Sequence, residues 1–391
     1  MPPAPDLLPP SRPLLGDPDV DPPAHDPLDG PAPDAFLLYS FGGPEQPDDV
    51  VPFLEHVTAG RGIPRERLAV VGSHYLDHFD GRSPINDQNR ALLAALREAF
   101  AGRPEGSPLR SAADASRLYW GNRHWHPFLA DELARMRDDG VVHALAFVTS
   151  LYPSASGCRQ YREALAEARA HVGPGAPRVT RLRYGHDHPG VVEPFADATR
   201  EALASLPDDE RHDARLVFTA HSIPTGMADA SGPDGGGYTR RLRQTAQAVV
   251  DRAAPGRDWD LVFQSRSGPP HVPWLEPDVG DHVEALAADG VRAVVVVPVG
   301  FISDHVEVRY DLDIQAAEQA EAVGVRLVRA STPGTDPRFV DMVVDLARER
   351  LERPALRRAL VEPLHDACPV GCCLAPGAAA TARPAGAGGA A

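Results

Sequence analysis

Residues 293–315 read AVVVVPVGFISDHVEVRYDLDIQ, so an apolar run passes directly into a histidine and a row of carboxylates. A continuous valine-rich run is typical of a strand that is buried on both faces of a parallel sheet. In open parallel sheets, ligands bind beyond the carboxyl ends of the strands. The stretch therefore predicts a core strand whose end delivers polar side chains to a ligand site.

The same alternation of apolar runs and helix-period segments continues along the chain, which predicts parallel sheets covered by helices. The strand candidates are 35–41, 117–122, 144–152, 178–185, 215–222, 260–268, 292–302 and 325–331. The helix candidates are 46–57, 86–100, 127–138, 158–171, 190–205, 238–253, 280–288, 311–322 and 336–352. Eight strands divide naturally into two sets of four, so we predict an α/β fold of two doubly wound domains with a cleft between them.

Composition sets the limits of these domains. Residues 1–35 are rich in proline and aspartate, which predicts a disordered leader. The first domain is expected over 36–175, with 336–362 packing back onto it, and the second over 176–335. Residues 363–391 are expected to form a low-complexity tail that carries three of the cysteines.

Charge and motifs exclude several functional classes. The 391-residue chain has 55 acidic against 39 basic side chains, a formal net charge of −16, which disfavours binding to nucleic-acid phosphates. Neither a G-x-G-x-x-G turn nor a G-x-x-x-x-G-K-[ST] loop follows a strand candidate, so nucleotide binding is not indicated. No secretory signal or membrane-spanning run is apparent, so we expect a cytoplasmic protein without a transmembrane segment, and a monomer.

Two polar residues at strand ends are candidates for chemistry. His221 ends the apolar run LVFTA, where a histidine is either a hydrogen-bonded structural residue or a functional group. Glu307, Asp311 and Gln315 are spaced by four and would share one helix face. Repulsion between like charges at that spacing favours a bound cation or a proton path, although a solvated helix face would give the same pattern.

The four cysteines are unevenly placed. Cys158 lies inside the body of the chain, whereas Cys368, Cys372 and Cys373 crowd its C-terminal end. In a large chain without a secretory signal, clustered cysteines indicate metal or redox chemistry more often than structural disulfides. Reduced surface thiols and a zinc site are the alternatives.

Several segments together resemble the ferrochelatases, which insert ferrous iron into a porphyrin. In family order they are SFGGPE (40–45), SPIN (83–86), WGNRHWHP (120–127), FTAHSIP (218–224), SRSGPPHVPWLEP (265–277) and PVGFISDHVEVRYDLD (298–313). The resemblance spans about residues 36–355. It implies two Rossmann-like halves, each with a four-stranded parallel sheet, that hold the porphyrin between them.

The resemblance also implies roles for individual residues. His221 would ligate iron or accept pyrrole protons, and Glu307 would be its carboxylate partner across the ring. His305 would lie at the same porphyrin face, with Asp311 the next station for iron or protons. The remaining candidates would contact the porphyrin or its propionates: Ser83, Tyr161 and Arg61.

Within the family, the cysteine pattern resembles a bacterial branch in which one internal and three C-terminal cysteines hold a [2Fe-2S] cluster. Cys158, Cys368, Cys372 and Cys373 match those ligands. That branch implies insertion of Fe2+ into coproporphyrin III, giving coproheme in haem b biosynthesis, with downstream haem-pathway enzymes as partners. The alternatives are a protoporphyrin IX ferrochelatase, a cobalt or nickel chelatase for another tetrapyrrole, and a non-catalytic haem or iron carrier.

The sequence departs from the family pattern at two positions. Phe41 stands where some coproporphyrin-using relatives carry a tyrosine that can reach the metal, and phenylalanine cannot ligate. Gln315 replaces the last acid expected of the carboxylate row, which would weaken any relay through that position.

Overall fold

The computed structural model describes residues 31–60, 63–102, 117–268, 271–352, 358–361 and 363–375. Within them, eight strands form two four-stranded sheets, and every pair of neighbouring strands is parallel. The predicted fold class is confirmed. Most of the predicted leader, residues 1–30, and the end of the predicted tail, residues 376–391, lie outside the described residues, as does Arg61.

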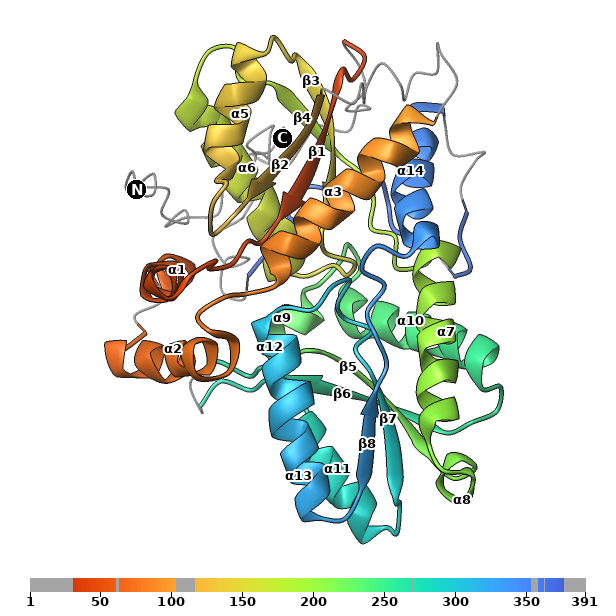
Figure 1. The fold of residues 1–391 in the computed structure, drawn as a ribbon. Helices are drawn as coiled ribbons and strands as arrows, with labels where there is room; N and C mark the ends of the chain where they lie inside the picture. Colours follow the sequence, from red (N-terminus) through yellow and green to blue (C-terminus); the bar gives the residue numbers. More distant parts are fainter. Residues whose placement is uncertain are drawn as a thin grey trace, which may run out of the picture.

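Both sheets have the same strand order (Figure 1). The first has the order β2-β1-β3-β4, made of β1 (Ala35–Ser40), β2 (Leu118–Asn122), β3 (His143–Val148) and β4 (Arg178–Arg181). The second has the order β6-β5-β7-β8, made of β5 (Arg215–His221), β6 (Trp259–Gln264), β7 (Ala293–Val297) and β8 (Arg326–Arg329). Six of the eight strands fall within the predicted runs, and β3 and β6 each begin one residue before theirs.

Two of the four edge strands are less buried than the inner strands. Every residue of β1, β3 and β7 is buried, as expected for strands covered on both faces. The edge strands β4 and β8 each begin and end with an arginine and are largely half-buried, and charge on an edge discourages pairing with another chain.

The helices cover the sheets and match the predicted segments closely (Figure 1). They are α1 (Val50–Thr58), α3 (Ile85–Ala101), α5 (Leu129–Asp138), α6 (Gln160–Val172), α7 (Pro189–Ser205), α10 (Gly237–Ala253), α11 (Val279–Ala288) and α14 (Pro337–Glu352). Short helical turns precede or link them: η1 (Pro47–Asp49), the π-helical η3 (Ala155–Arg159), α8 (Asp208–Arg211) and α9 (Thr225–Asp229).

A helix that we did not predict, α2 (Arg65–Phe79), lies beside α1. Its inward face is formed by Leu68, Val71, Tyr75 and Phe79, a helical spacing that was present in the sequence. The pattern was blurred because Val70 is 60% exposed and Leu76 is 44% exposed on the same helix. The helical spacing of α2 is therefore visible in the sequence only when Val70 and Leu76 are left out of the pattern.

The helix predicted over 311–322 begins five residues earlier, at Val306, so that prediction was wrong at its N-terminal end. It comprises α12 (Val306–Val308), the π-helical η4 (Arg309–Gln315) and α13 (Ala316–Ala322). The helix starts early because His305 caps its N-terminus: the His305 Nδ1 accepts the Val308 backbone N–H at 3.5 Å. π-Helical turns inside α-helices occur frequently at functional sites.

The two sheets share one core. A single cluster of buried side chains runs from Phe36 of the first sheet through Phe195 and Phe339 on α7 and α14 to Phe218 of the second sheet. Helix α14 packs against both α3 and α7. The predicted boundary between 175 and 176 stays a prediction.

Candidate active site

His221 is the last residue of β5, an inner strand of the second sheet. Its ring Nδ1 lies 2.5 Å from the backbone oxygen of Ser222. A carbonyl oxygen can only accept, so Nδ1 carries the proton and Nε2 of the neutral ring presents a lone pair. That Nε2 lies 3.7 Å from Oε2 of Glu307. The two side chains are 34% and 46% exposed, so a ligand can reach the space between them.

The chain brings Glu307 to His221 although the two are far apart in sequence. After β7, Gly300 passes so close to β5 that an added Cβ would lie 2.5 Å from the Cβ of Ala220. The Gly300 N–H donates to Thr219 O at 3.1 Å and fixes this approach. Glu307 then sits in the first turn of the helix that His305 caps. The structure thus joins the two candidates that sequence spacing could not pair.

Asp311 lies one turn farther along the same helix, on η4. The hydroxyl of Ser265 donates to its Oδ2, and Gln264 Nε2 lies 3.4 Å from the same atom. Burial raises the pKa of Asp311 to about 6, and the Glu307 carboxylate adds to this against the hydrogen bond from Ser265. Asp311 therefore gains and loses a proton close to neutral pH.

Ser265 holds Asp311 from a restricted backbone conformation. Its φ is 62°, in the left-handed region that residues other than glycine rarely adopt. The residues that follow, RSGPPHVPWLEP, complete a segment that resembles the family sequence. Such conformations persist where the surrounding structure holds them, and they cluster at functional sites.

Helix α2 approaches these carboxylates from the other half of the molecule. Its buried Tyr75 packs in the same apolar cluster as Val306, the first residue of α12. Burial raises the pKa of the Tyr75 phenol, and Glu307 and Asp311 add to this. The His74 ring stacks on Tyr310 of η4, with centroids 3.9 Å apart and planes at 11°. The helix that sequence analysis missed therefore packs beside the helix that carries Glu307 and Asp311.

The remaining residues singled out near this site, His305, Gln315 and Phe41, differ in burial and in what they contact. Burial lowers the pKa of His305, opposed by Glu307 and assisted by His221, and its ring packs on Phe301. Gln315 is exposed at the end of η4. The Phe41 ring lies 4.4 Å from that of His124 and offers no ligand atom.

Ser83 and Tyr161 are both buried. Ser83 is 3% exposed, its N–H donates to Pro44 O at 2.8 Å, and its Oγ accepts the Ile85 N–H at 3.5 Å. Tyr161 is 5% exposed, and its ring contacts Tyr39 and lies beneath the guanidinium of Arg123. Their contact with a porphyrin stays a prediction, as does that of Arg61.

Comparison with known proteins decides the family. A family model described as Ferrochelatase matches residues 33–351. The chain belongs to the ferrochelatase family. It is 52% identical over 367 residues to a protein of Streptomyces griseus named coproporphyrin III ferrochelatase, covering 88% of this chain and 95% of that one. It is 54% identical over 325 residues to a protein of the same name from Mycolicibacterium vanbaalenii, covering 83% and 92%.

Among solved structures, this ferrochelatase-family chain is similar to SirB from Bacillus subtilis with Fe3+, at 12% identity and a TM-score of 0.48, covering 84% of this chain and 100% of that one. None of the helices in the described part of the chain is long and apolar enough to span a membrane.

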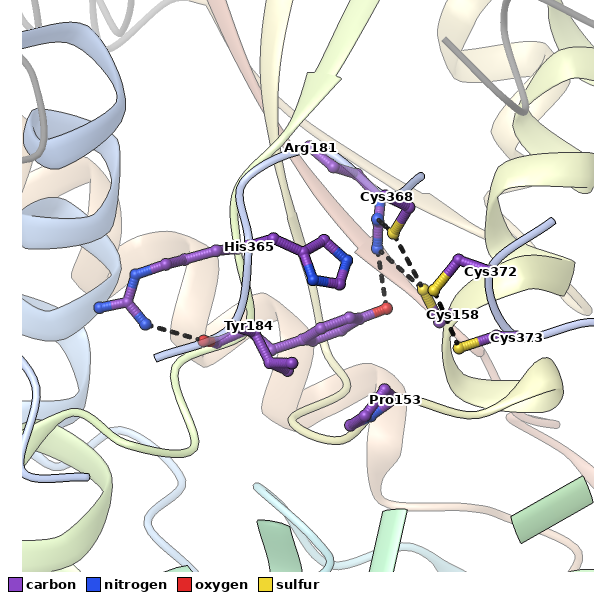
Figure 2. Close-up of a pocket in the computed structure, with 10 residues that line it drawn as sticks. Pro153, Cys158, Arg181, Tyr184, His365, Cys368, Cys372 and Cys373 are labelled. Atoms are coloured by element: carbon purple, nitrogen blue, oxygen red, sulfur yellow. Dashed lines mark hydrogen bonds between the residues drawn. The ribbon is translucent and has the colours of Figure 1, made fainter. Parts of the chain in front are cut away.

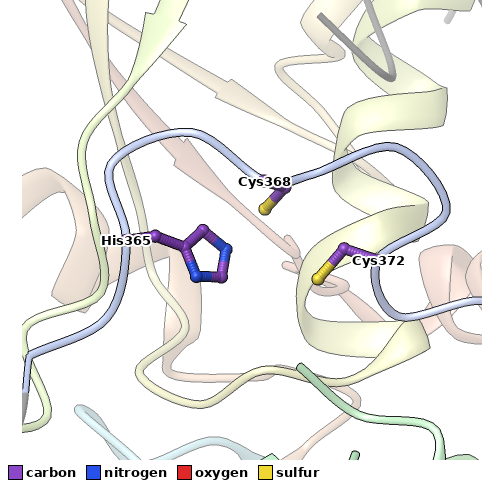
Figure 3. Close-up of side chains that lie close together, drawn as sticks. All are labelled: His365, Cys368 and Cys372. Carbon is purple, nitrogen blue, oxygen red and sulfur yellow. The ribbon is translucent and has the colours of Figure 1, made fainter. Parts of the chain in front are cut away.

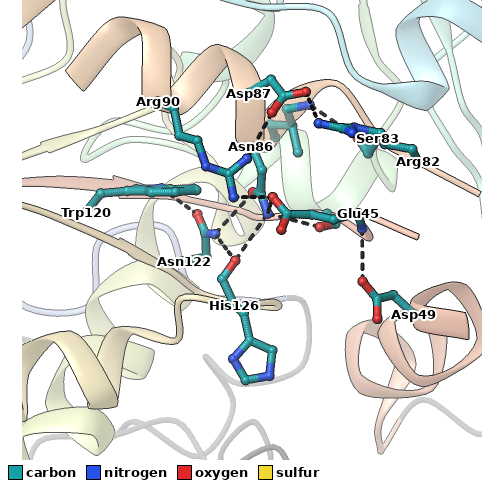
Figure 4. A network of polar contacts seen from close by, with 12 residues as sticks. Glu45, Asp49, Arg82, Ser83, Asn86, Asp87, Arg90, Trp120, Asn122 and His126 are labelled. Atoms are coloured by element: carbon teal, nitrogen blue, oxygen red, sulfur yellow. Dashed lines mark hydrogen bonds and ion pairs between the residues drawn. The ribbon is translucent and has the colours of Figure 1, made fainter. Parts of the chain in front are cut away.

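In the first half of this ferrochelatase-family fold, the strand ends are bound into a polar network (Figure 4). Asn122, at the end of β2, donates to His126 O at 2.9 Å and accepts from Trp120 Nε1 at 2.9 Å. Asn86 donates to Gly43 O at 3.2 Å and to His126 O at 3.1 Å. These segments of the family pattern serve as a frame, a role that the sequence did not reveal.

Gly42 lets the first strand end lie against this frame. Its φ is +86°, and an added Cβ would lie 2.8 Å from the Cβ of Asn122. Any L-residue there would be strained by its backbone and would collide with the network. The glycine in SFGGPE is thus explained by close packing.

The four cysteines meet in a second, separate site (Figure 2). All four thiols are buried: Cys158 in η3, and Cys368, Cys372 and Cys373 in the C-terminal segment. Cys158 Sγ lies 3.8 Å from Cys368 Sγ, and Cys372 Sγ lies 3.7 Å from Cys373 Sγ. The alternative of thiols on an exposed tail is therefore wrong for the described residues 363–375.

Hydrogen-bond donors face these sulfurs. Arg181 lies 3.3 Å from Cys368 Sγ and 3.7 Å from Cys158 Sγ, and the Gly232 N–H donates to Cys373 Sγ at 3.1 Å. Hydrogen bonds from the Cys158 and Cys372 thiols, with Arg181 adding to them, hold the pKa of Cys368 well below its ordinary value. The Arg181 guanidinium and the Gly232 N–H would stabilise thiolates at these positions, and sequence analysis gave no sign of either donor.

His365 joins the same pocket (Figure 3). A ring nitrogen of His365 and the sulfurs of Cys368 and Cys372 lie within 4.8 Å of one another. These three residues alone could hold a metal ion. The donor set therefore includes one residue that the sequence did not suggest.

Proposed function

We propose that this protein is a coproporphyrin III ferrochelatase, which inserts Fe2+ into coproporphyrin III and releases two protons to give coproheme. The observation that carries the proposal is the lone pair of His221 Nε2 facing the Glu307 carboxylate at 3.7 Å. The choice of coproporphyrin III as the substrate is supported by the relatives of that name, which are identical to this chain at about half of the aligned residues.

The side chains suit the two tasks of the reaction. Each pyrrole N–H bond must break while ferrous iron exchanges water for ring nitrogens. We assign proton acceptance to His221 Nε2, because Nδ1 is already committed to Ser222 O. When Nε2 takes the proton, both ring nitrogens donate, one to Ser222 O and one toward Glu307, so the imidazolium is held on both sides.

Asp311 is the proposed next station. Its pKa of about 6 lets it take a proton from the Glu307 side and release it near neutral pH. A row of carboxylates is also suited to binding hydrated ferrous iron, before the porphyrin nitrogens replace the water ligands of the iron. Gln315 cannot ionise, so the row of acids ends at Asp311 on this face.

Anaerobic metallation tests the proposal. Fe2+ is offered with either coproporphyrin III or protoporphyrin IX, and the Soret band is followed. We expect a higher kcat/KM for coproporphyrin III. A preference for protoporphyrin IX would overturn the substrate, and metallation of neither porphyrin would favour a haem or iron carrier.

We also propose that Cys158, Cys368, Cys372 and Cys373 hold a [2Fe-2S] cluster. The two sulfur pairs, at 3.8 and 3.7 Å, have about the 3.8 Å separation of two thiolates on one tetrahedral metal with bonds of about 2.3 Å. A [2Fe-2S] cluster takes four thiolates, two on each iron. When bound, the cluster would tie the C-terminal segment to the body of the protein, since Cys158 lies in η3 and the other three ligands lie in that segment. Its role would be structural or sensory, because iron insertion itself needs no electron transfer.

The cluster proposal is tested on protein purified without oxygen. Visible charge-transfer absorption, equal iron and acid-labile sulfide, and an EPR signal after one-electron reduction are expected. Stoichiometric zinc without that absorption would instead favour a site that uses His365.

A further inference from the structure

We infer that Tyr238 is a positioning residue for His221, and that Cys373 sets the position of Tyr238 through the loop between α9 and α10. The inference rests on the proposed function of His221. Tyr238 is the second residue of α10 and is 7% exposed. Its hydroxyl donates to the backbone oxygen of His221 at 2.8 Å.

That hydrogen bond fixes the peptide on which the imidazole depends. The peptide between His221 and Ser222 is held at its oxygen by Tyr238 and at its N–H by Gln264 O, at 2.7 Å. Ser222 O in turn accepts from His221 Nδ1 and so selects the tautomer. Loss of the Tyr238 hydroxyl frees one side of this peptide, and small misplacements of a catalytic group are costly.

Ser231 fixes Tyr238 at the start of α10. Its buried Oγ accepts the Tyr238 N–H at 2.7 Å and donates to Ala228 O. The Ser231 carbonyl accepts the Gly237 N–H at 2.9 Å. One serine therefore closes the whole turn and supplies a cap to the first turn of the helix.

The next residue of the loop is tied to the cysteine site. Gly232 donates its N–H to Cys373 Sγ at 3.1 Å, across 141 positions of sequence. Cys373 itself has a φ of 59°, an uncommon value for a residue with a Cβ. A bond between its sulfur and a bound group would hold this conformation, and with it the anchor of the loop. The path runs from Cys373 through Gly232, Ser231 and Tyr238 to His221.

The first test compares two tyrosines. Tyr238→Phe removes the hydroxyl bonded to His221 O, and Tyr152→Phe is the matched control. Tyr152 is 3% exposed, its ring lies against that of Tyr238 with centroids 6.3 Å apart, and its hydroxyl donates to Val299 O at 3.0 Å, a carbonyl outside the His221–Ser222 peptide. A hydrogen bond of about 1 kcal/mol lost from positioning should lower kcat about fivefold to tenfold in Tyr238→Phe, with KM for the porphyrin unchanged. Tyr152→Phe should keep its kcat and lose similar stability.

Equal falls in kcat in both variants, or none in Tyr238→Phe, would overturn the role of Tyr238. The tautomer of His221, measured from its ring nitrogen shifts by NMR, should also move in Tyr238→Phe alone. This reading needs no turnover. It therefore separates failure of this inference from failure of the proposed function.

The second test concerns Cys373. Cys373→Ala and Cys368→Ala each remove one candidate cluster ligand, but only Cys373→Ala removes the acceptor of the Gly232 N–H. Amide exchange at Gly232 and Tyr238 should accelerate more in Cys373→Ala than in Cys368→Ala. The kcat loss caused by Tyr238→Phe should also shrink in the Cys373→Ala background, because the loop is already released. Equal exchange in the two alanine variants, or additive losses of kcat, would remove Cys373 from the path.

Discussion

The two halves of the molecule share one strand order but end their central strands differently. β1 ends at Ser40, which is fully buried and whose Oγ receives hydrogen bonds from Asn89 and Thr149. β5 occupies the same place in the second sheet and ends at His221, which is 34% exposed and faces Glu307. One strand end is saturated by the protein and the other is left open to a ligand. The topology thus supplies two equivalent positions, and the side chains decide which one a ligand can reach.

Substitution of His221, at the open end of β5, should have the largest effect on turnover. We expect His221→Ala to lower kcat by about 10²–10⁴, because a positioned proton acceptor contributes that much. Porphyrin binding, measured by fluorescence quenching, should change little. Ser40→Ala is the matched variant in the first half, and it should cost about 1–2 kcal/mol of unfolding free energy while its folded molecules keep their kcat.

The comparison would break if Ser40→Ala abolished turnover without unfolding the protein. It would also break if His221→Ala turned over normally, since another group would then accept the pyrrole protons.

The edge strands offer the next comparison. β2 ends at Asn122 and β6 ends at Gln264, and both side chains are almost fully buried. Asn122→Ala removes hydrogen bonds to Trp120 and His126, so we expect a loss of about 2–3 kcal/mol in urea unfolding with kcat retained. Gln264→Ala should reduce both stability and turnover, because Gln264 also reaches Asp311. Equal falls in turnover would mean that the first half takes part in the chemistry.

Replacing Asp311 with asparagine should raise stability at pH 8 but lower activity. Because burial raises its pKa to about 6, ionisation costs the folded state more than the unfolded state. Stability is greatest when the group is protonated, declines between about pH 4 and 6, and is constant above that range. Asp311→Asn should therefore be more stable than wild type at pH 8, by about 1–2 kcal/mol after allowance for partial exposure, and equal to it near pH 4.

The same substitution should slow metallation at pH 8 and remove the limb of the rate profile near pH 6. Thermal unfolding at both pH values, together with initial rates from pH 5 to 8, checks both effects. A variant that is less stable than wild type at pH 8 would contradict the burial cost.

Much of this contrast could be predicted from sequence, because strand burial and strand-end chemistry are local patterns. The valine-rich run before Gly300 predicted β7 and a site at its end, and the resemblance assigned His221 and Glu307. The start of α12 could not be predicted, since a histidine caps it in place of Ser, Thr, Asp or Asn. The link from Gly232 to Cys373 joins residues 141 apart and has no local signature. Contacts of that range depend on the fold and leave no periodic trace.

The smallest expected effect belongs to Gln315→Glu, which would restore an acid at the end of the carboxylate row. The side chain is exposed, so solvent screens the added charge, and its influence on Asp311 should be slight. We expect the initial rate at pH 7 to change less than twofold, and by less than the loss in Asp311→Asn. If Asp311 lies between Gln315 and the site, even this small change should vanish in the double variant Asp311→Asn/Gln315→Glu. A gain that survives the loss of Asp311 would mean that iron or protons pass along another face of the helix.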